Sequence, residues 1–153
     1  MKHLDPKDIQ LLALLQKNAQ ASAIELSDAL AMSASQVGRR RHRLEVEGYI
    51  AATPTRLNPA MIGLNVQAFI QIQTEAQSAK THSAISALVV RTPAIVGAWT
   101  LTGEADYMFR VFCRDLGALN MLVQNTLLPH PSIGRVQSQI VMDQLKDDTA
   151  LPL

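Results

Sequence analysis

The chain has 153 residues, of which 48% are hydrophobic and 18% charged, and its formal net charge is +1. An apolar content of this size supports a core, but no apolar stretch could span a membrane and no signal peptide is visible, so we expect a cytoplasmic protein. The charge is uneven: residues 33–43 hold four arginines and no carboxylate, whereas residues 51–153 balance seven basic against seven acidic side chains. A basic run often serves only to keep a helix surface soluble. The alternative interpretation is a local surface that binds a polyanion.

The first predicted element is a helix that begins after Asp5. Asp5 suits the N-cap, Pro6 the first helical position, and Asp8 adds negative charge to the first turn. Apolar side chains then recur at near-helical spacing from Ile9 to Ala19. We expect this helix to pack against the two that follow it.

Two short capped helices come next, and only residues 31–32 separate them. Ser22 with Glu25 forms the first capping box, and Ser33 with Gln36 forms the second. So short a joint forces a sharp angle between the helices, which is the outline of a helix-turn-helix. This arrangement favours DNA as the partner of the basic run.

The second of these helices has a buried edge and an outward side. At 100° per residue, Val37 and Leu44 lie within about 20° of one another and should face the core. Arg40 and Arg41 lie nearer this edge, so one or both should lie along the surface or pair with an acid such as Glu45. The outward side would face the major groove, where arginine suits guanine, glutamine suits adenine, and other polar groups hold phosphates. The predicted DNA-contacting residues are Ser33, Ser35, Gln36, Arg39, Arg40, His42 and Arg43.

Gly48 should end the third helix. We expect Tyr49–Ala52 to be a short extended segment that could form a wing. Prolines and a glycine are dense in residues 51–63, which indicates a linker. The sequence thus predicts a three-helix DNA-binding domain over residues 1–50, a linker over 51–63 and a second domain over 64–153.

The second domain alternates strand-like and helix-like patterns. Two of the strands are joined by only three residues, 103–105, which implies a hairpin. The order β-α-β-β-α-β predicts an α+β, ferredoxin-like sandwich whose helices cover one sheet face. The expected elements are a strand at 65–74, a helix at 80–91, strands at 95–102 and 106–114, a helix at 116–127 and a strand at 134–145.

The uncovered face of that sheet should carry a mixture of side chains. One side of a strand carries Met108, Arg110, Phe112 and Arg114, and Phe69 lies on the polar side of another strand. Such a surface suggests association with a second copy, although scattered exposed apolar side chains are a common alternative. Cys113 has no partner for an internal disulfide and is expected to be a buried core thiol rather than a nucleophile.

Short features spread along the whole chain match one known family in order and spacing. They are Leu4-Asp5 with Asp8 and Ile9, Glu25-Leu26, the Ser33–Leu44 segment with Glu45, Gly48 with Ile50, Gly63, the Thr102–Tyr107 turn, Ser138, Lys146 and Leu151-Pro152-Leu153. On these residues the chain resembles the Lrp/AsnC, or feast/famine, family of transcriptional regulators. One departure is Arg41, which stands where the family pattern usually has an aliphatic residue.

The resemblance implies a helix-turn-helix joined to a ferredoxin-like regulatory domain that binds an amino acid or a related small molecule. It also implies a homodimer that assembles into tetramers or octamers. Gly103 would let backbone N–H groups approach a ligand carboxylate, and Asp106 could accept a ligand ammonium or merely fold back onto its own turn. By resemblance the effector region comprises Thr102, Gly103, Asp106, Tyr107 and Ser138.

An enzyme and an architectural DNA-binding protein are the rival interpretations. The four histidines are far apart without metal-ligand spacing, and no phosphate loop, nucleotide fingerprint or nucleophile elbow occurs. We therefore expect no catalytic residues, no metal and no cofactor beyond a small-molecule effector. The sequence does not exclude an architectural protein that compacts DNA without sensing a ligand. Our prediction is a sequence-specific, nucleoid-associated transcriptional regulator that binds double-stranded DNA.

Overall fold

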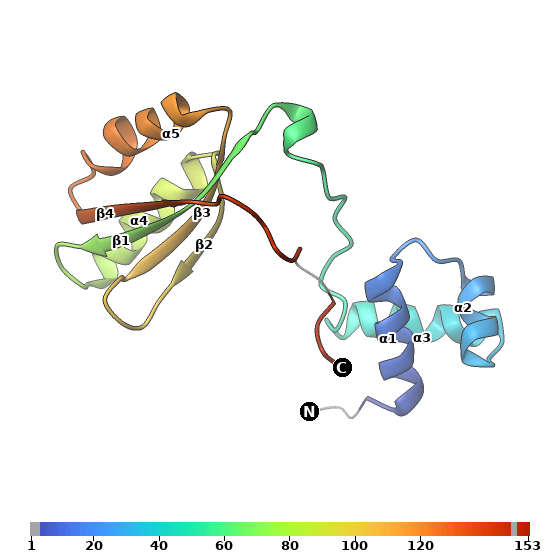
Figure 1. Cartoon of the computed structure of the whole chain (residues 1–153). Helices are drawn as coiled ribbons and strands as arrows, with labels where there is room; N and C mark the ends of the chain where they lie inside the picture. Colours follow the sequence, from blue (N-terminus) through green and yellow to red (C-terminus); the bar gives the residue numbers. More distant parts are fainter. Residues whose placement is uncertain (1–3, 148–149) are drawn as a thin grey trace. The chain divides into compact units, whose positions relative to one another are not determined.

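The computed structural model describes residues 4–147 and 150–153 (Figure 1). The chain divides into two compact units, one made of Met1–Arg56 with Leu145–Leu153 and the other of Leu57–Gln144. The division between residues 56 and 57 falls within the linker expected over residues 51–63, and residues 145–153 group with the first unit, which the sequence did not indicate. Among the described residues, no helix is long and apolar enough to cross a membrane.

The first unit contains α1 (Pro6–Lys17), α2 (Ala23–Leu30) and α3 (Ala34–Val46). All three helices begin with a capping box, in which the N-cap side chain and the side chain three residues later each accept a backbone N–H. The boxes predicted at Ser22 and Ser33 are confirmed. The box on α1 joins Asp5 to Asp8, so Asp8 returns a hydrogen bond in addition to placing charge in the first turn.

The core of the first unit is formed by apolar side chains from all three helices. Val37 and Leu44 are 1% and 0% exposed, which confirms the buried edge predicted for α3. Each buried leucine of this kind contributes roughly 1.5–3 kcal/mol to stability. The core residues are Leu11, Leu12, Leu15, Leu26, Leu30, Val37 and Leu44.

The turn between α2 and α3 is held by a side chain of α1. Ala31 adopts a left-handed conformation (φ 51°), which is uncommon for a residue with a Cβ. Lys7 Nζ donates a 2.6 Å hydrogen bond to the Leu30 carbonyl, one of the groups left open at the end of α2. Packing of α1 therefore fixes the angle between the two helices of the motif.

The wing suggested at Tyr49–Ala52 does not form, since within the described residues no strand precedes Val66. Gly48 has φ 80° at the end of α3, and both Tyr49 and Ile50 donate their N–H groups to the Leu44 carbonyl. Ile50 also packs against the first unit's core. These contacts fold Tyr49 and Ile50 onto the helix end, so their N–H groups are not available for strand pairing.

The second unit begins with a 3-10 turn, η1 (Ala60–Ile62), and continues with alternating strands and helices. The sheet order is β2-β3-β1-β4, and the predicted β-α-β-β-α-β sequence is confirmed. The elements are β1 (Val66–Thr74), α4 (Ala79–Arg91), β2 (Ile95–Thr100), β3 (Tyr107–Cys113), α5 (Leu116–Leu122) with the π-helical turn η2 (Val123–Leu127), and β4 (Ile133–Ile140).

The core of the second unit lies between α4, α5 and one face of the sheet (Figure 1). The final strand ends at Ile140, opposite Ala68, rather than at residue 145 as expected; Val141 still donates to the Gln67 carbonyl, but β1 begins at Val66 and offers no partner for the residues near 145. Cys113 is buried, as predicted, and burial raises the pKa of its thiol. The core residues are Ala68, Ile70, Ile72, Ile85, Leu88, Ile95, Phe109, Val111, Cys113, Leu119, Leu122, Leu127 and Ile133.

Candidate functional site

A buried carboxylate on α1 binds two arginines of α3. Asp8 is 1% exposed and accepts a 2.7 Å hydrogen bond from Arg40, while its second oxygen pairs with Arg43. Arg40 also pairs with Asp5. Burial tends to raise the pKa of Asp8, but hydrogen bonds from Arg40, the Asp5 backbone and Arg43 hold it below its ordinary value. Asp8 is therefore ionised, and this cluster of two acids and two bases carries no net charge.

Arg41, the departure from the family pattern, reaches solvent along the helix surface. Its guanidinium pairs with Glu45 at 3.1 Å, as the sequence suggested, and donates a 3.3 Å hydrogen bond to the Ala19 carbonyl. The side chain is 31% exposed, so its charged end is not taken into the core. An arginine fits at this position without any rotation of α3.

Arg39 differs from the other three arginines of α3, because its side chain forms no ion pair or hydrogen bond with any residue the structure describes. Arg39, His42 and Ser35 are exposed, as predicted for the outward side of α3. Arg39 and His42 also line one hollow with Asp5, Arg40 and Arg43. The available positive charge on α3 is thus concentrated at Arg39.

Ser33 and Gln36 are occupied in the capping box of α3. The Gln36 amide oxygen accepts the Ser33 N–H at 3.0 Å, and the Ser33 hydroxyl accepts the Gln36 N–H at 3.3 Å. A glutamine that reads adenine uses both its oxygen and its nitrogen. For such a contact the Gln36 oxygen would have to give up its hydrogen bond with the Ser33 N–H. The Gln36 amide nitrogen can donate a hydrogen bond while the capping box stays intact.

The second candidate site lies where the β2–β3 loop meets the end of β1. Asp106 accepts hydrogen bonds from the Thr74 N–H (2.7 Å), the Thr74 hydroxyl (2.8 Å) and the Gln77 amide (2.6 Å). The Thr74 backbone and hydroxyl bonds, and then the Gln77 bond, hold the pKa of Asp106 below its ordinary value. Asp106 therefore binds the neighbouring β1–α4 loop instead of folding back onto its own turn.

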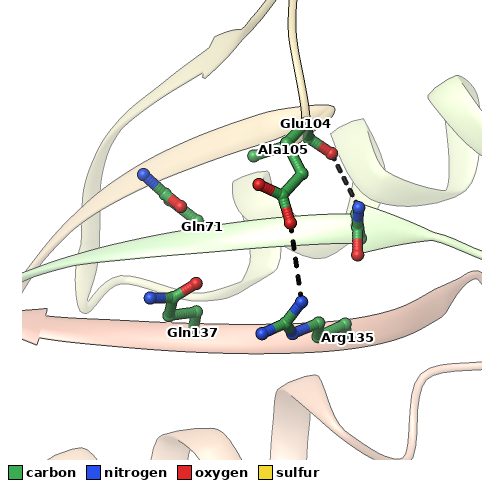
Figure 2. A pocket seen from close by; sticks show the side chains of 6 residues that line it. Gln71, Glu104, Ala105, Arg135 and Gln137 are labelled. Atoms are coloured by element: carbon green, nitrogen blue, oxygen red, sulfur yellow. Dashed lines mark hydrogen bonds and ion pairs between the residues drawn. The ribbon is translucent and has the colours of Figure 1, made fainter.

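A polar pocket opens beside this junction. Glu104 faces Arg135 at 3.6 Å, and its carbonyl accepts a 2.8 Å hydrogen bond from Gln73, in an adjoining hollow that Gln71, Ala105 and Gln137 also line (Figure 2). A Cβ at Gly134 would lie only 2.9 Å from Glu75, so glycine leaves room for that carboxylate. The lining residues of the pocket are Gln73, Thr74, Glu75, Gln77, Gly103, Glu104, Asp106, Gly134 and Arg135.

The predicted effector residues are only partly brought together. Gly103 and Asp106 line the pocket, and Thr102 lies in the same turn without lining it. Tyr107 instead stacks on His82, with ring centroids 6.2 Å apart and a 3.3 Å hydrogen bond. Ser138 lies within β4 opposite Ile70 and is absent from the lining.

Sequence reasoning missed several lining residues, among them Glu75, Gln77 and Arg135. Residues 74–80 show no sharp pattern, and nothing local marks Arg135 as a site residue. The signal lay in the topology: antiparallel pairing of β1 with β4 sets the end of one beside the start of the other, as in the pair Gln73↔Arg135. Among the described residues, no group of three or more His, Cys, Asp or Glu side chains could hold a metal ion.

Two family models match the chain, the AsnC-type helix-turn-helix domain over residues 4–45 and the Lrp/AsnC ligand binding domain over residues 67–151. The DNA-binding transcriptional activator DecR of Escherichia coli K12 is 31% identical over 150 residues, which cover 98% of this chain and 99% of the relative. The Bkd operon transcriptional regulator of Pseudomonas aeruginosa is 28% identical over 153 residues, with all of both chains covered.

Solved structures of similar proteins match over nearly the same length. A transcriptional regulator from Neisseria meningitidis, crystallised in complex with L-Met, superposes with a TM-score of 0.93 at 33% identity and covers 98% of this chain and 97% of its own. Escherichia coli AsnC superposes with a TM-score of 0.87 at 25% identity, covering 98% and 99%. Both units of the chain are therefore matched by the same proteins.

Proposed function

Because this chain belongs to the Lrp/AsnC family of DNA-binding transcriptional regulators, we propose that it binds specific DNA sequences through α3 and that an amino acid bound in the second unit controls this binding. The observation that carries the proposal is the match of both family domains, with an exposed Arg39 on the outward side of α3. We place its action on chromosomal DNA in the cytoplasm.

On the DNA-binding surface, Arg39 and His42 are the strongest candidates for base edges. An arginine without an acid partner keeps all its donors for a guanine or a phosphate. Arg40 and Arg43 are held against Asp5 and Asp8, which suits side chains that orient α3 and touch phosphates with their remaining donors. Ser33, Ser35 and Gln36 complete the proposed contact set at the end of α3 that enters the groove.

For the effector, we propose that an amino acid binds in the pocket beside the β2–β3 loop. Arg135 and the backbone at Gly103 would hold the ligand carboxylate, while Glu104 or Glu75 would accept its ammonium group. Support comes from the Neisseria meningitidis relative, which was solved with L-Met. In this arrangement Asp106 is a positioning residue, because Thr74 and Gln77 already occupy most of its acceptor sites.

We further propose that the open face of the sheet pairs with a second copy of the chain. Phe69 lies opposite Arg110, and Arg110 lies over the Phe112 ring at 5.3 Å. Trp99, 49% exposed, adds apolar surface beside Met108. A dimer of this kind would present two α3 helices to DNA about one helical turn apart, or a multiple of that spacing, and dimers could assemble into tetramers or octamers.

Selection from a random double-stranded DNA library, carried out with and without each standard amino acid at millimolar concentration, tests the proposal. We expect one enriched motif whose recovery changes with at least one amino acid. Failure to retain any DNA at low salt would refute DNA binding. Retention without a motif and without any amino-acid effect would instead favour the architectural alternative.

A further inference from the structure

Gly38 lies inside α3, at a position where no contact among the described residues requires glycine. Its φ is not positive, unlike those of Gly48, Gly63 and Gly103, so any residue could adopt its helical conformation. Apart from its chain neighbours and the adjacent backbone of α3, a Cβ built at Gly38 would meet no atom of the described residues within 4 Å, and the position is exposed. After proline, glycine is the least favourable residue in a helix interior. The helix is therefore weakened by a residue that brings no packing benefit.

Gly38 borders the outward side of α3. Ser35 precedes it by three residues and His42 follows it by four, so these two exposed side chains flank it along the helix surface. It immediately precedes Arg39, the arginine without an internal partner. The N-terminal half of a recognition helix comes nearest the base edges, and Gly38 lies in that half. The missing side chain thus leaves bare backbone beside the proposed reading groups.

We propose that Gly38 is the point of closest approach between α3 and DNA, and that it determines how deeply the helix enters the major groove. Bare backbone at this position lets the DNA contact the helix directly, which brings Arg39 and His42 within reach of base edges. A methyl group there would hold the helix away from the groove. This inference rests on the proposed DNA-binding function and adds a specificity-determining residue to it.

The opposed effects of one substitution on stability and on DNA binding give the test. Gly38→Ala should raise the melting temperature of the DNA-free protein by about 2–4 °C, because alanine favours the helix. The same change should weaken binding to the DNA motif selected by the unsubstituted protein by about fivefold or more, and Gly38→Leu should weaken it further. Fluorescence anisotropy with labelled DNA and thermal unfolding measure the two effects.

Gly117→Ala is the control for DNA affinity, since Gly117 is an exposed helical glycine in the second unit, where an added Cβ would lie 3.1 Å from the Asp115 carboxylate. It should leave DNA affinity within about twofold of the unsubstituted protein. If the unsubstituted protein binds but Gly38→Ala binds equally well or more tightly, the inference is overturned while the proposed function stands. A fall in melting temperature with Gly38→Ala would also overturn it, because the space around Gly38 would not be empty. If the unsubstituted protein binds no DNA, the proposed function itself fails.

Discussion

The two units hold their charged side chains in opposite ways. In the first unit, Asp8 is buried between Arg40 and Arg43, so these charges are committed to one another. In the second unit, Glu104 and Arg135 face each other across 3.6 Å and are 84% and 63% exposed. Exposed pairs of that length contribute little to stability and exchange partners readily. Fixed charges suit a rigid binding surface, whereas loosely paired ones are available to a ligand.

The largest expected effect comes from removing the fixed carboxylate. Asp8→Ala should lower the free energy of unfolding by about 2–3 kcal/mol, somewhat less than for a fully buried ion pair because both arginines reach solvent. Urea unfolding followed by circular dichroism measures this change. Asp28→Ala removes an acid from the exposed surface of α2 and should cost less than about 0.5 kcal/mol. Equal effects of the two substitutions would contradict a special role for Asp8.

The same carboxylate gives the first unit a defined response to acid. The pKa of Asp8 is lower in the folded chain than in the unfolded chain, so ionised Asp8 stabilises the fold. That contribution is complete above the unfolded-chain pKa of about 4 and is lost as the pH falls through the folded pKa. The stability difference between the unsubstituted protein and Asp8→Asn should therefore shrink in acid. A difference that stays constant from pH 7 to pH 2 would rule this explanation out.

Substitutions at Arg39 and Arg43 should distinguish an effect on DNA affinity alone from an effect on both DNA affinity and stability. Arg39→Ala should weaken DNA binding by about 1–3 kcal/mol and leave the unfolding free energy unchanged, because no described residue binds its side chain. Arg43→Ala should lower stability as well, since it removes the ion pair with one oxygen of the buried Asp8 carboxylate and leaves that oxygen only the Asp5 N–H as a partner. Anisotropy titrations at several salt concentrations, with parallel thermal unfolding, distinguish the two. Equal losses of stability would mean that Arg39 has an internal role.

In the second unit, Arg135→Ala should abolish the amino-acid response while leaving the fold intact. A ligand that binds only the folded state raises the melting temperature, because it adds about 2.7 kcal/mol to the free energy of unfolding when its concentration is a hundred times Kd. We expect that shift to disappear in Arg135→Ala and to persist in Arg114→Ala, which removes an exposed arginine just after β3. If the ligand-induced shift survives in Arg135→Ala, the pocket assignment is wrong.

The smallest expected effect concerns the C-terminal segment of the first unit. The Gln16 amide accepts the Leu151 N–H at 2.6 Å and donates to the Leu151 carbonyl at 3.2 Å. Gln16→Ala should cost about 0.5–1.5 kcal/mol through loss of this pair of bonds. Gln10→Ala, on the exposed side of the same helix, serves as the control. Identical melting temperatures for the two variants would show that the segment does not stabilise the unit.

The helices and strands could be predicted because their signals are local. Caps such as Ser33 with Gln36 and the spacing of Val37 and Leu44 lie within one helix, and the strand alternation lies within one strand. The Asp8–Arg40 pair joins residues 32 positions apart. Sequence spacing therefore could not show whether Arg40 pairs with an acid or faces DNA. The pocket likewise combines the end of β1, the β2–β3 loop and the start of β4. Gly103 and Asp106 entered through the family resemblance, whereas Arg135 required the strand register.

The most direct measurement is the affinity of the whole chain for its selected DNA motif, determined by anisotropy with and without each amino acid. The proposed function predicts tight binding that weakens with salt and changes at least fivefold with one or more amino acids, about the lower limit of typical allosteric coupling. It also predicts that Arg135→Ala binds the same DNA with no such change. Binding that no amino acid alters, or no binding at low salt, would contradict it.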